Sequence, residues 1–275
     1  MNIMLKIFLY IILISISLIC ILPLYFMIVC ATQSNLNIST LQAIFPGNEF
    51  FNNFDRLTHI VPVFSAFKNS VVVTIPATLL SAFFGSLTAY GFAKYKFRGK
   101  NYLFSLLLIS LIVPQQICFI GFYKVCALFN ITNTLLPLII PSIASPLFVF
   151  FLRYYIQYKI SDSMMAAARI DGCSEFKIYH SIVLPNIIPG IATMSMFTFI
   201  SVWNSYLIPI TILEDISLYT VPVMTALSKA LYGNDYGAIY AAIAVFTAPV
   251  IIVYLLCSRM LIKGLKFSSV KVMNR

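Results

Sequence analysis

Six long apolar stretches, separated by shorter polar ones, dominate the hydropathy pattern of the chain. They lie at about residues 7–30, 69–93, 102–123, 134–152, 187–213 and 238–258. A helix needs roughly 20 apolar residues to cross the ~30 Å hydrocarbon core of a bilayer. The pattern therefore predicts an all-α membrane protein with six transmembrane helices, forming a single transmembrane domain over residues 1–275.

The first apolar stretch allows two interpretations, a cleaved signal peptide or a retained helix. Lys6 precedes the stretch, as a basic residue does in a signal peptide. The run over residues 7–30 is longer than the apolar core of a signal peptide, however, and it lacks a small-x-small cleavage site. We therefore expect a retained first helix.

The distribution of basic residues predicts how the chain is oriented. Hydrophobic residues make up 61% of the chain and charged residues only 9%, with a net charge of +10. If the N-terminus is cytoplasmic, six crossings leave four basic residues outside: Arg56, Lys68, Lys124 and Lys229. The others fall on the cytoplasmic side: Lys6, Lys94, Lys96, Arg98, Lys100, Arg153, Lys159, Arg169, Lys177, Arg259, Lys263, Lys266, Lys271 and Arg275. Cytoplasmic loops of membrane proteins are rich in Lys and Arg. The charge thus indicates a multi-pass protein with both termini cytoplasmic, and no nucleic-acid partner.

The sequence lacks the residues that would power transport. All eight acidic residues lie outside the apolar stretches, whereas ion-coupled carriers usually place ionisable groups at membrane depth. Neither a GxxxxGK[ST] phosphate loop nor an HExxH motif is present. The six cysteines show no metal-binding spacing. We predict no metal, no cofactor and no enzymatic activity, so any uphill transport must draw its energy from another polypeptide.

Several of the apolar stretches contain proline, among others Pro76, Pro114, Pro137, Pro141, Pro146, Pro209 and Pro249. Each removes a backbone hydrogen bond and tends to kink a helix. Freed carbonyls persist in a membrane where protein or a water-filled cavity satisfies them. The prolines are compatible with a transport lumen, and structural kinks alone would also explain them.

Small residues recur every four positions in the second stretch, at Ser81, Gly85, Ala89 and Ala93. Such a stripe lets two helices approach closely in lipid. Packing within the chain and packing against a partner subunit both fit, and we favour the first.

The polar segment 153–185 is the largest cytoplasmic loop in this topology. Met164–Ile170 consists of strong helix formers, and Asp171-Gly172 then ends the helix, because glycine readily adopts the left-handed turn. A second helix is expected from Cys173 to Leu184, with Ser174 as N-cap and Pro185 as its end. Two interpretations fit, an element that docks in a groove of a partner or a simple amphipathic re-entry loop.

The same segment resembles a known family. Ala166–Pro185, AAARIDGCSEFKIYHSIVLP, is similar to the EAA loop of binding-protein-dependent ABC importer permeases, with its E-A-A-x-x-D-G-A pattern and later L-P. Four further stretches resemble the carbohydrate-uptake (MalG-like) branch of that family. They are Ala89–Lys100, Asn133–Ile156, Trp203–Ile210 and Leu261–Lys271.

This resemblance implies a type I ABC importer permease (MetI-like) fold in the bacterial cytoplasmic (inner) membrane. It also implies four kinds of partner: a second permease subunit, two copies of an ABC ATPase subunit, an extracytoplasmic solute-binding protein, and a sugar or polyol-type substrate. The cytoplasmic EAA coupling loop, 153–185, would then contact the ATPase. Its expected coupling residues are Ala166, Ala167, Ala168, Asp171, Gly172 and Phe176.

The chain departs from the family pattern at three positions. Ala166 stands where the family has the leading Glu, and Ser161 stands where it has Pro. Ser268 replaces a Gly of the C-terminal tail. Because the Glu helps to anchor the loop in the ATPase of such permeases, its absence bears on how strongly the loop docks.

The solute is left open among oligosaccharides, polyols and glycerol 3-phosphate. Amide and aromatic side chains of the third and fifth stretches are candidates for the solute pathway: Gln115, Gln116, Tyr123, Trp203, Asn204 and Tyr206. Trp and Tyr near span ends also serve as interfacial anchors. The alternative function is a stand-alone secondary carrier, disfavoured by the lack of intramembrane ionisable groups and inverted repeats. An intramembrane enzyme lacks a catalytic constellation.

Overall fold

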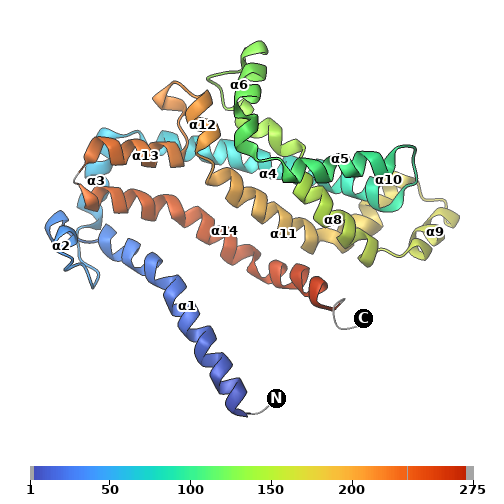
Figure 1. Cartoon of the computed structure of the whole chain (residues 1–275), viewed down its shortest axis with the longest axis horizontal. Helices are drawn as coiled ribbons and strands as arrows, with labels where there is room; N and C mark the ends of the chain where they lie inside the picture. Colours follow the sequence, from blue (N-terminus) through green and yellow to red (C-terminus); the bar gives the residue numbers. More distant parts are fainter. Residues whose placement is uncertain (1–2, 234, 271–275) are drawn as a thin grey trace. The chain divides into compact units, whose positions relative to one another are not determined.

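The computed structural model describes residues 3–233 and 235–270. Within these residues it consists of helices and their connections, with no strand (Figure 1). The chain divides into two compact units. One comprises residues 1–67 and 221–249, and the other comprises residues 68–220 and 250–275.

The first unit contains the N-terminal helix and two of the segments predicted to be extracytoplasmic, those around Arg56 and Lys229. Its complete helices are α1 (Ile3–Ala31), α2 (Asn35–Ser39), α3 (Phe50–Ile60) and α13 (Val221–Tyr232). Two longer helices begin in this unit, α4 (Val63–Lys94) and α14 (Tyr236–Val270). The α1 helix is apolar on all sides, and its described side chains are exposed from Met4 to Phe26. An all-round apolar helix without protein cover suits a lipid environment.

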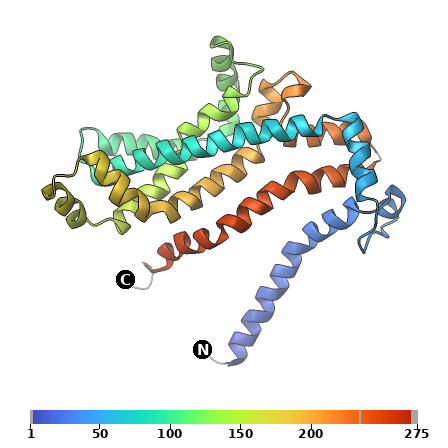
Figure 2. The same ribbon diagram turned by 180° about the vertical axis from the view of Figure 1, so that it is seen from behind.

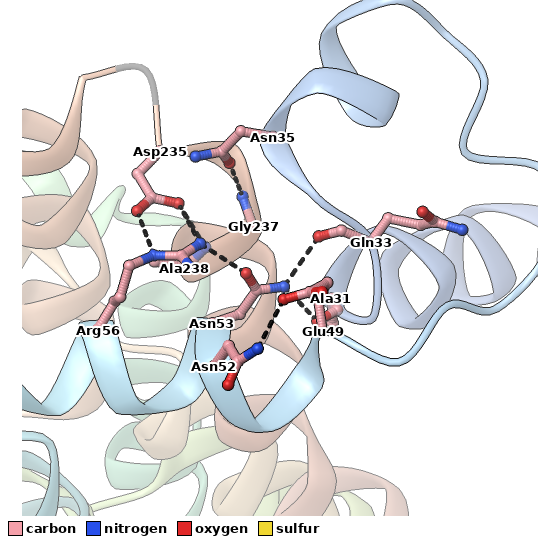
Figure 3. A network of polar contacts seen from close by, with 10 residues as sticks. All are labelled: Ala31, Gln33, Asn35, Glu49, Asn52, Asn53, Arg56, Asp235, Gly237 and Ala238. Carbon is pink, nitrogen blue, oxygen red and sulfur yellow. Dashed lines mark hydrogen bonds and ion pairs between the residues drawn. The ribbon is translucent and has the colours of Figure 1, made fainter.

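A polar network holds the segments of this unit together (Figure 3). Asn53 Nδ2 donates to the carbonyl oxygens of Ala31 at 2.8 Å and Gln33 at 3.0 Å. Arg56 donates to Asn53 Oδ1 at 2.6 Å and to both carboxylate oxygens of Asp235, at 2.9 and 3.2 Å. The network thereby joins the end of α1, helix α3 and the start of α14.

Two further bonds fix the start of α14 (Figure 3). Gly237 N–H donates to Asn35 Oδ1 at 2.8 Å, and Ala238 N–H donates to Asp235 Oδ1 at 3.0 Å. A Cβ at Gly237 would lie 2.5 Å from Asn53 Oδ1, so the close approach requires glycine. Burial alone would raise the pKa of the Asp235 carboxyl, but its hydrogen bonds from Arg56 and Ala238 hold the pKa below its ordinary value.

The second unit contains the remaining helices. In chain order they are α5 (Lys100–Ile112), the 3₁₀ turn η1 (Gln115–Cys118), α6 (Phe119–Leu128), α7 (Leu136–Ile139), the 3₁₀ turn η2 (Ile140–Ile143), α8 (Pro146–Lys159), α9 (Asp162–Ile170), α10 (Glu175–Ile178), the π-helical segment η3 (Tyr179–Val183), α11 (Leu184–Trp203), α12 (Leu207–Ile212) and the 3₁₀ turn η4 (Ile216–Leu218). The core of the unit forms where α8 packs between α5 and α11 and against the C-terminal half of α4 (Figures 1 and 2).

Five helical segments of the described chain are long and apolar enough to cross a membrane. They are Met4–Ala31, Val63–Lys94, Leu136–Lys159, Glu175–Trp203 and Tyr236–Ser258. These correspond to five of the six predicted spans. The sixth is reached when α5 and α6 are counted as one broken span.

The third predicted span, 102–123, is not one straight helix. Helix α5 ends at Ile112, and the chain bends by 94° before α6. Pro114 stands at the break with extended backbone (φ −61°, ψ 125°). Proline disfavours helical geometry at the preceding residue, and Val113 is indeed extended. Because the residues on both sides of the break are apolar, the hydropathy pattern did not predict it.

The small-residue stripe of α4 packs within the chain, as favoured above. Ser81 and Ala89 are fully buried. A Cβ at Gly85 would lie 2.6 Å from Cδ1 of Phe148, a buried residue of α8. The absent side chain at Gly85 thus makes room for the Phe148 ring.

Candidate functional site

The loop between α8 and α11 begins with a capped helix. Ser161 is the N-cap of α9, and its Oγ accepts a hydrogen bond from the Met164 N–H at 3.2 Å. A serine hydroxyl in this place satisfies one of the free N–H groups of the first turn. The predicted helix Met164–Ile170 is present, and it starts two residues earlier, at Asp162.

Gly172 ends this helix as the sequence predicts. Its φ is +75°, in the left-handed region. Gly172 N–H donates to the Arg169 carbonyl at 3.1 Å, and Cys173 N–H donates to the Ala168 carbonyl at 3.0 Å. This pair of bonds is a Schellman motif, which satisfies carbonyls at the end of a helix. A Cβ at Gly172 would meet nothing within 4 Å, so the glycine is needed for its backbone conformation and not for space.

The second helix has the predicted N-cap, but it starts at Glu175, two residues later than predicted, and it ends differently. Ser174 is the N-cap of α10, with its Oγ accepting from the Lys177 N–H at 3.4 Å. The prediction that Pro185 ends the helix is wrong, because α11 begins at Leu184 and continues through Pro185 to Trp203. Pro185 occupies the first turn of α11, where a missing N–H costs little. The π-helical segment Tyr179–Val183 precedes it.

The loop exposes apolar side chains on both α9 and α10. Met165 and Ala168 point into the core of the unit, whereas Ala166 and Ala167 are exposed. Ile170 is 86% exposed and Phe176 is 71% exposed. Of the six predicted coupling residues, five are exposed: Ala166, Ala167, Asp171, Gly172 and Phe176. The sixth, Ala168, is buried and packs in the core of the unit.

Two charged clusters fasten this loop to the C-terminal end of α4. Lys94 Nζ, almost completely buried, donates to Asp162 Oδ1 at 2.7 Å and to the Ile160 carbonyl. The Tyr95 hydroxyl donates to Glu175, which also accepts from Arg169 at 2.6 and 3.3 Å. Neither cluster was predicted from the sequence.

The ionisation of these groups follows from their contacts. The hydrogen bond from Lys94 lowers the pKa of the exposed Asp162 carboxyl. Burial raises the pKa of the Tyr95 phenol, and its bond to Glu175 acts in the same direction. The hydrogen bond to Glu175 raises the pKa of the Arg169 guanidinium. Near neutral pH the clusters therefore hold two ion pairs and a protonated phenol that can donate.

One more contact links the loop to α4 at a deeper level. The Tyr179 hydroxyl, in the π-helical segment, lies 2.7 Å from Ser86 Oγ. The Tyr90 ring is tilted against the Tyr179 ring, with centroids 5.3 Å apart. The last turns of α4, from Ser86 to Lys94, and the following residue Tyr95 thus contact the loop.

The predicted solute-pathway residues lie at two helix breaks. Trp203 ends α11, is buried, and stacks on Phe199 with centroids 5.6 Å apart. Asn204 is the exposed C-cap of α11, and Tyr206, 40% exposed, precedes α12. At the other break, Gln116 and Tyr123 are exposed. The side chain of Gln115 lies outside what the structure describes.

A cavity of about 470 Å³ lies within the second unit, beside the break between α11 and α12. Its walls come from α4, α5, α8, α11 and α12 and from the segments around α7 and η4. Ser201, Val202 and Ser205 line it, whereas the pathway candidates of the sequence analysis are not among its described lining residues. Four prolines of the predicted spans line it: Pro137, Pro141, Pro146 and Pro209.

No candidate metal centre is found in the part of the chain that the structure describes, because no three His, Cys, Asp or Glu side chains gather there.

The long apolar helices of the described chain are those of a multi-pass membrane protein. Comparison with known families shows which family it belongs to. The chain belongs to the family of binding-protein-dependent transport system inner membrane components, whose model matches residues 81–267.

Individual relatives cover most of the chain. The arabinooligosaccharides transport system permease protein AraQ of Halalkalibacterium halodurans is 34% identical over 205 residues, 74% of this chain and 73% of the relative. AraQ of Bacillus subtilis is 32% identical over 208 residues, 76% of this chain and 74% of the relative. The probable starch degradation products transport system permease protein AmyC of Thermoanaerobacterium thermosulfurigenes is 28% identical over 260 residues, 94% of both chains.

A solved structure shows the same fold. A chain of a bacterial ABC transporter involved in the import of the acidic polysaccharide alginate superposes with a TM-score of 0.78, at 21% identity, over 93% of this chain and 96% of that chain. The predicted type I ABC importer permease fold is confirmed. The chain is a multi-pass permease subunit and not an enzyme, and ATP hydrolysis falls to a partner ATPase. The family also implies a solute-binding protein as partner.

Proposed function

We propose that this chain is one of two permease subunits of an ATP-driven importer for sugars or related solutes in the bacterial cytoplasmic membrane. The substrate class rests on the relatives, whose names specify arabinooligosaccharides and starch degradation products. The role in coupling rests on one structural observation, the exposure of the apolar residues Ala166, Ala167, Ile170 and Phe176 on a loop that is fastened to α4. A membrane subunit without a nucleotide-binding motif needs such a surface to receive work from an ATPase.

In the proposed assembly the chain forms a single transmembrane domain that pairs with a second permease subunit. Two ATPase copies bind on the cytoplasmic side, and an extracytoplasmic solute-binding protein delivers the solute. Both termini and the loop 153–185 are cytoplasmic. The basic residues support this orientation through the positive-inside rule.

Coupling follows from the packing of the loop. ATP-driven closure of the ATPases moves α9 and α10 together, because Arg169 on α9 is paired with Glu175 on α10. The Schellman turn at Gly172 fixes the angle between them. Rigid-body transitions of packed helices at a subunit interface would then alternate the access of the pathway.

A tryptophan scan of two exposed alanines tests this function. Ala167→Trp places bulk on the docking face, so we expect loss of ATPase co-purification and of ATP-driven sugar uptake. Ala127→Trp is the matched control, because Ala127 is an exposed alanine of α6, on the predicted opposite side of the membrane. If Ala167→Trp keeps the co-purification and uptake of the Ala127→Trp control, the loop is only a re-entry segment.

The orientation is tested separately. A cysteine introduced at Asn274 in a Cys-free chain should react with a membrane-impermeant maleimide in inverted vesicles and not in intact cells. Labelling from outside intact cells would contradict the cytoplasmic C-terminus.

A further inference from the structure

Four basic side chains gather where α4 passes into α5. Lys96 and Arg98 are exposed in the connecting turn, residues 95–99, and Lys100 is the first residue of α5. The fourth, Arg153, lies on α8, which packs against α5. Lys100 is close enough to both Lys96 and Arg153 for electrostatic repulsion. Like charges held together in this way favour the binding of an anion.

The described carboxylates leave this cluster without a counter-ion. Among the described residues, none of its four members takes part in an ion pair. Asp162 does interact with the charge of Lys96, but its closest partner is Lys94, whose Nζ donates to Asp162 Oδ1 at 2.7 Å. Lys100 Nζ donates to the Tyr95 carbonyl oxygen at 2.8 Å, which does not neutralise its charge. The cluster therefore stays available to an external anion.

Aromatic rings hold the Arg153 guanidinium where a carboxylate is missing. Its Cζ lies 3.7 Å from the centroid of the Phe104 ring and 5.3 Å from that of the Tyr154 ring. Such cation–π contacts orient an arginine without cancelling its charge. By contrast, Arg56 and Arg169 are each paired with a carboxylate. Arg153 is thus fixed in position with its charge uncompensated.

An open hollow of about 330 Å³ lies at this turn. Its walls are formed by Lys96, Phe97, Gly99, Lys100, Asn101 and Tyr102. Gly99 is the N-cap of α5, a helix of 13 residues, and it leaves the first N–H groups of the helix without a side-chain acceptor from the cap. The N-terminus of a helix attracts anions, and phosphates in particular. Two ammonium groups, an amide and a helix end thus surround one space that suits a phosphate.

The place of the hollow relative to the membrane decides which phosphate has access to it. Helix α4 ends one candidate span at Lys94, and α5 begins the next at Lys100, so the turn between them lies at a membrane face. Tyr102 is 69% exposed at the hollow, and tyrosine is enriched at the level of the lipid headgroups. Basic pockets between helices at the cytoplasmic face bind anionic headgroups. A lipid phosphate is therefore favoured over a soluble one.

We propose that this hollow and Arg153 form a binding site for the headgroup phosphate of an anionic phospholipid, with Lys96, Arg98 and Lys100 as the other cationic residues. In the proposed orientation the lipid belongs to the cytoplasmic leaflet. The site lies beside an anchor of the loop 153–185, because Lys94 precedes Lys96 by two residues. The inference requires a membrane-inserted chain, and it depends neither on the proposed solute nor on the proposed coupling role.

The test uses the complete importer in detergent, titrated with a phosphatidylglycerol that carries a photoactivatable diazirine at its headgroup. Illumination should cross-link the lipid to residues 96–102, which mass spectrometry locates. Unlabelled phosphatidylglycerol should compete, whereas phosphatidylcholine of equal chain length and inorganic phosphate should not. Equal competition by phosphatidylcholine would show an unspecific lipid contact, and competition by inorganic phosphate would show a site for soluble anions. Either result overturns the proposal.

Variants of the exposed cations test the charge requirement without disturbing the packing. Each basic residue near a membrane surface contributes about a fivefold preference for anionic lipid. Lys96→Gln combined with Arg98→Gln should therefore raise the half-maximal phosphatidylglycerol concentration about tenfold or more. Lys159→Gln combined with Lys177→Gln is the matched control, because it removes two exposed cations on the same predicted side of the membrane. The control should leave that concentration nearly unchanged.

Co-purification of the ATPase is measured on the same variants. If the variant of the turn cross-links as the control does, the lipid site is refuted. Loss of the ATPase with unchanged cross-linking would likewise refute it and assign the cations to the partner. Because cross-linking needs neither transport nor a known solute, a failure here is distinct from a failure of the proposed function.

Discussion

Gly172 gives the sharpest test of how the loop transmits force, because its requirement is purely conformational. At φ +75° it lies in the left-handed region, and its missing Cβ would face open space. A non-glycine residue there is strained by about 1–2 kcal/mol, and a β-branched residue by more. Relief of the strain would break the two hydrogen bonds that end α9, each with a net contribution of about 0.5–1.5 kcal/mol.

Gly172→Val should therefore reduce the population of the native hinge. A free-energy change of 1.4 kcal/mol is a factor of ten, so a strain of about 1–2 kcal/mol lowers the ratio of native to altered hinge about 5- to 30-fold. If only the native hinge docks, the apparent affinity for the ATPase falls in proportion to its population. ATP turnover should then continue with little uptake.

The chain provides a matched control for the strain itself. Gly99, in the turn before α5, has φ +79° and likewise no atom within 4 Å of a built Cβ. Gly99→Val carries the same conformational cost at a place outside the loop. Gly172→Asn should retain most of the coupling, because asparagine tolerates the left-handed region. ATPase activity and sugar uptake are measured together in reconstituted importer. Equal uptake per ATP in Gly172→Val and Gly99→Val would refute the role of the hinge.

Three further predictions concern the contacts around the loop and the outer network. Lys94→Met removes the hydrogen bonds from Lys94 to Asp162 and to the Ile160 carbonyl and should lower coupled uptake several-fold, whereas Lys159→Met, an exposed lysine at the end of α8, should not. Ala166→Glu restores the family pattern and should strengthen co-purification of the ATPase; weaker association would contradict docking through this face. Asp235→Asn should lower the unfolding temperature in detergent at neutral pH, because the folded pKa of Asp235 is depressed and its ion pair with Arg56 stabilises above the ordinary carboxyl pKa of 3.8. That difference should fade as the pH drops below this value, and a difference that persists in acid would disprove it.

The loop was predictable from sequence because its chemistry is local. Ser174 caps the residues that follow it, and Gly172 ends the helix that precedes it, so each signal lies within a few residues of its effect. The spans were predictable for a similar reason, since hydropathy is summed over adjacent residues. The helix breaks were harder to predict. Pro114 interrupts a predicted span, whereas Pro185 lies in the first turn of α11 and does not interrupt the helix.

The anchors of the loop and the lining of the cavity were not predictable, since both depend on residues far apart in the chain. Lys94 meets Asp162 across 68 positions, and Tyr95 meets Glu175 across 80. From the sequence, Lys94 indicated only that its segment is cytoplasmic. Likewise, Trp203 and Tyr206 were predicted to be solute-pathway residues from their residue types alone, whereas their neighbours Ser201 and Ser205 line the cavity.

The positions of these anchors decide which helices a moving loop displaces. The loop follows α8 and continues into α11 through covalent connections, and such connections alone would move only these two helices. Lys94 and Tyr95 add the end of α4, and the contact between Tyr179 and Ser86 adds the same helix about two turns deeper. Two separated contacts along one helix resist its rotation as well as its translation. Since α4, α8 and α11 all line the cavity of the second unit, the proposed displacement of α9 and α10 would reach three of its walls at once.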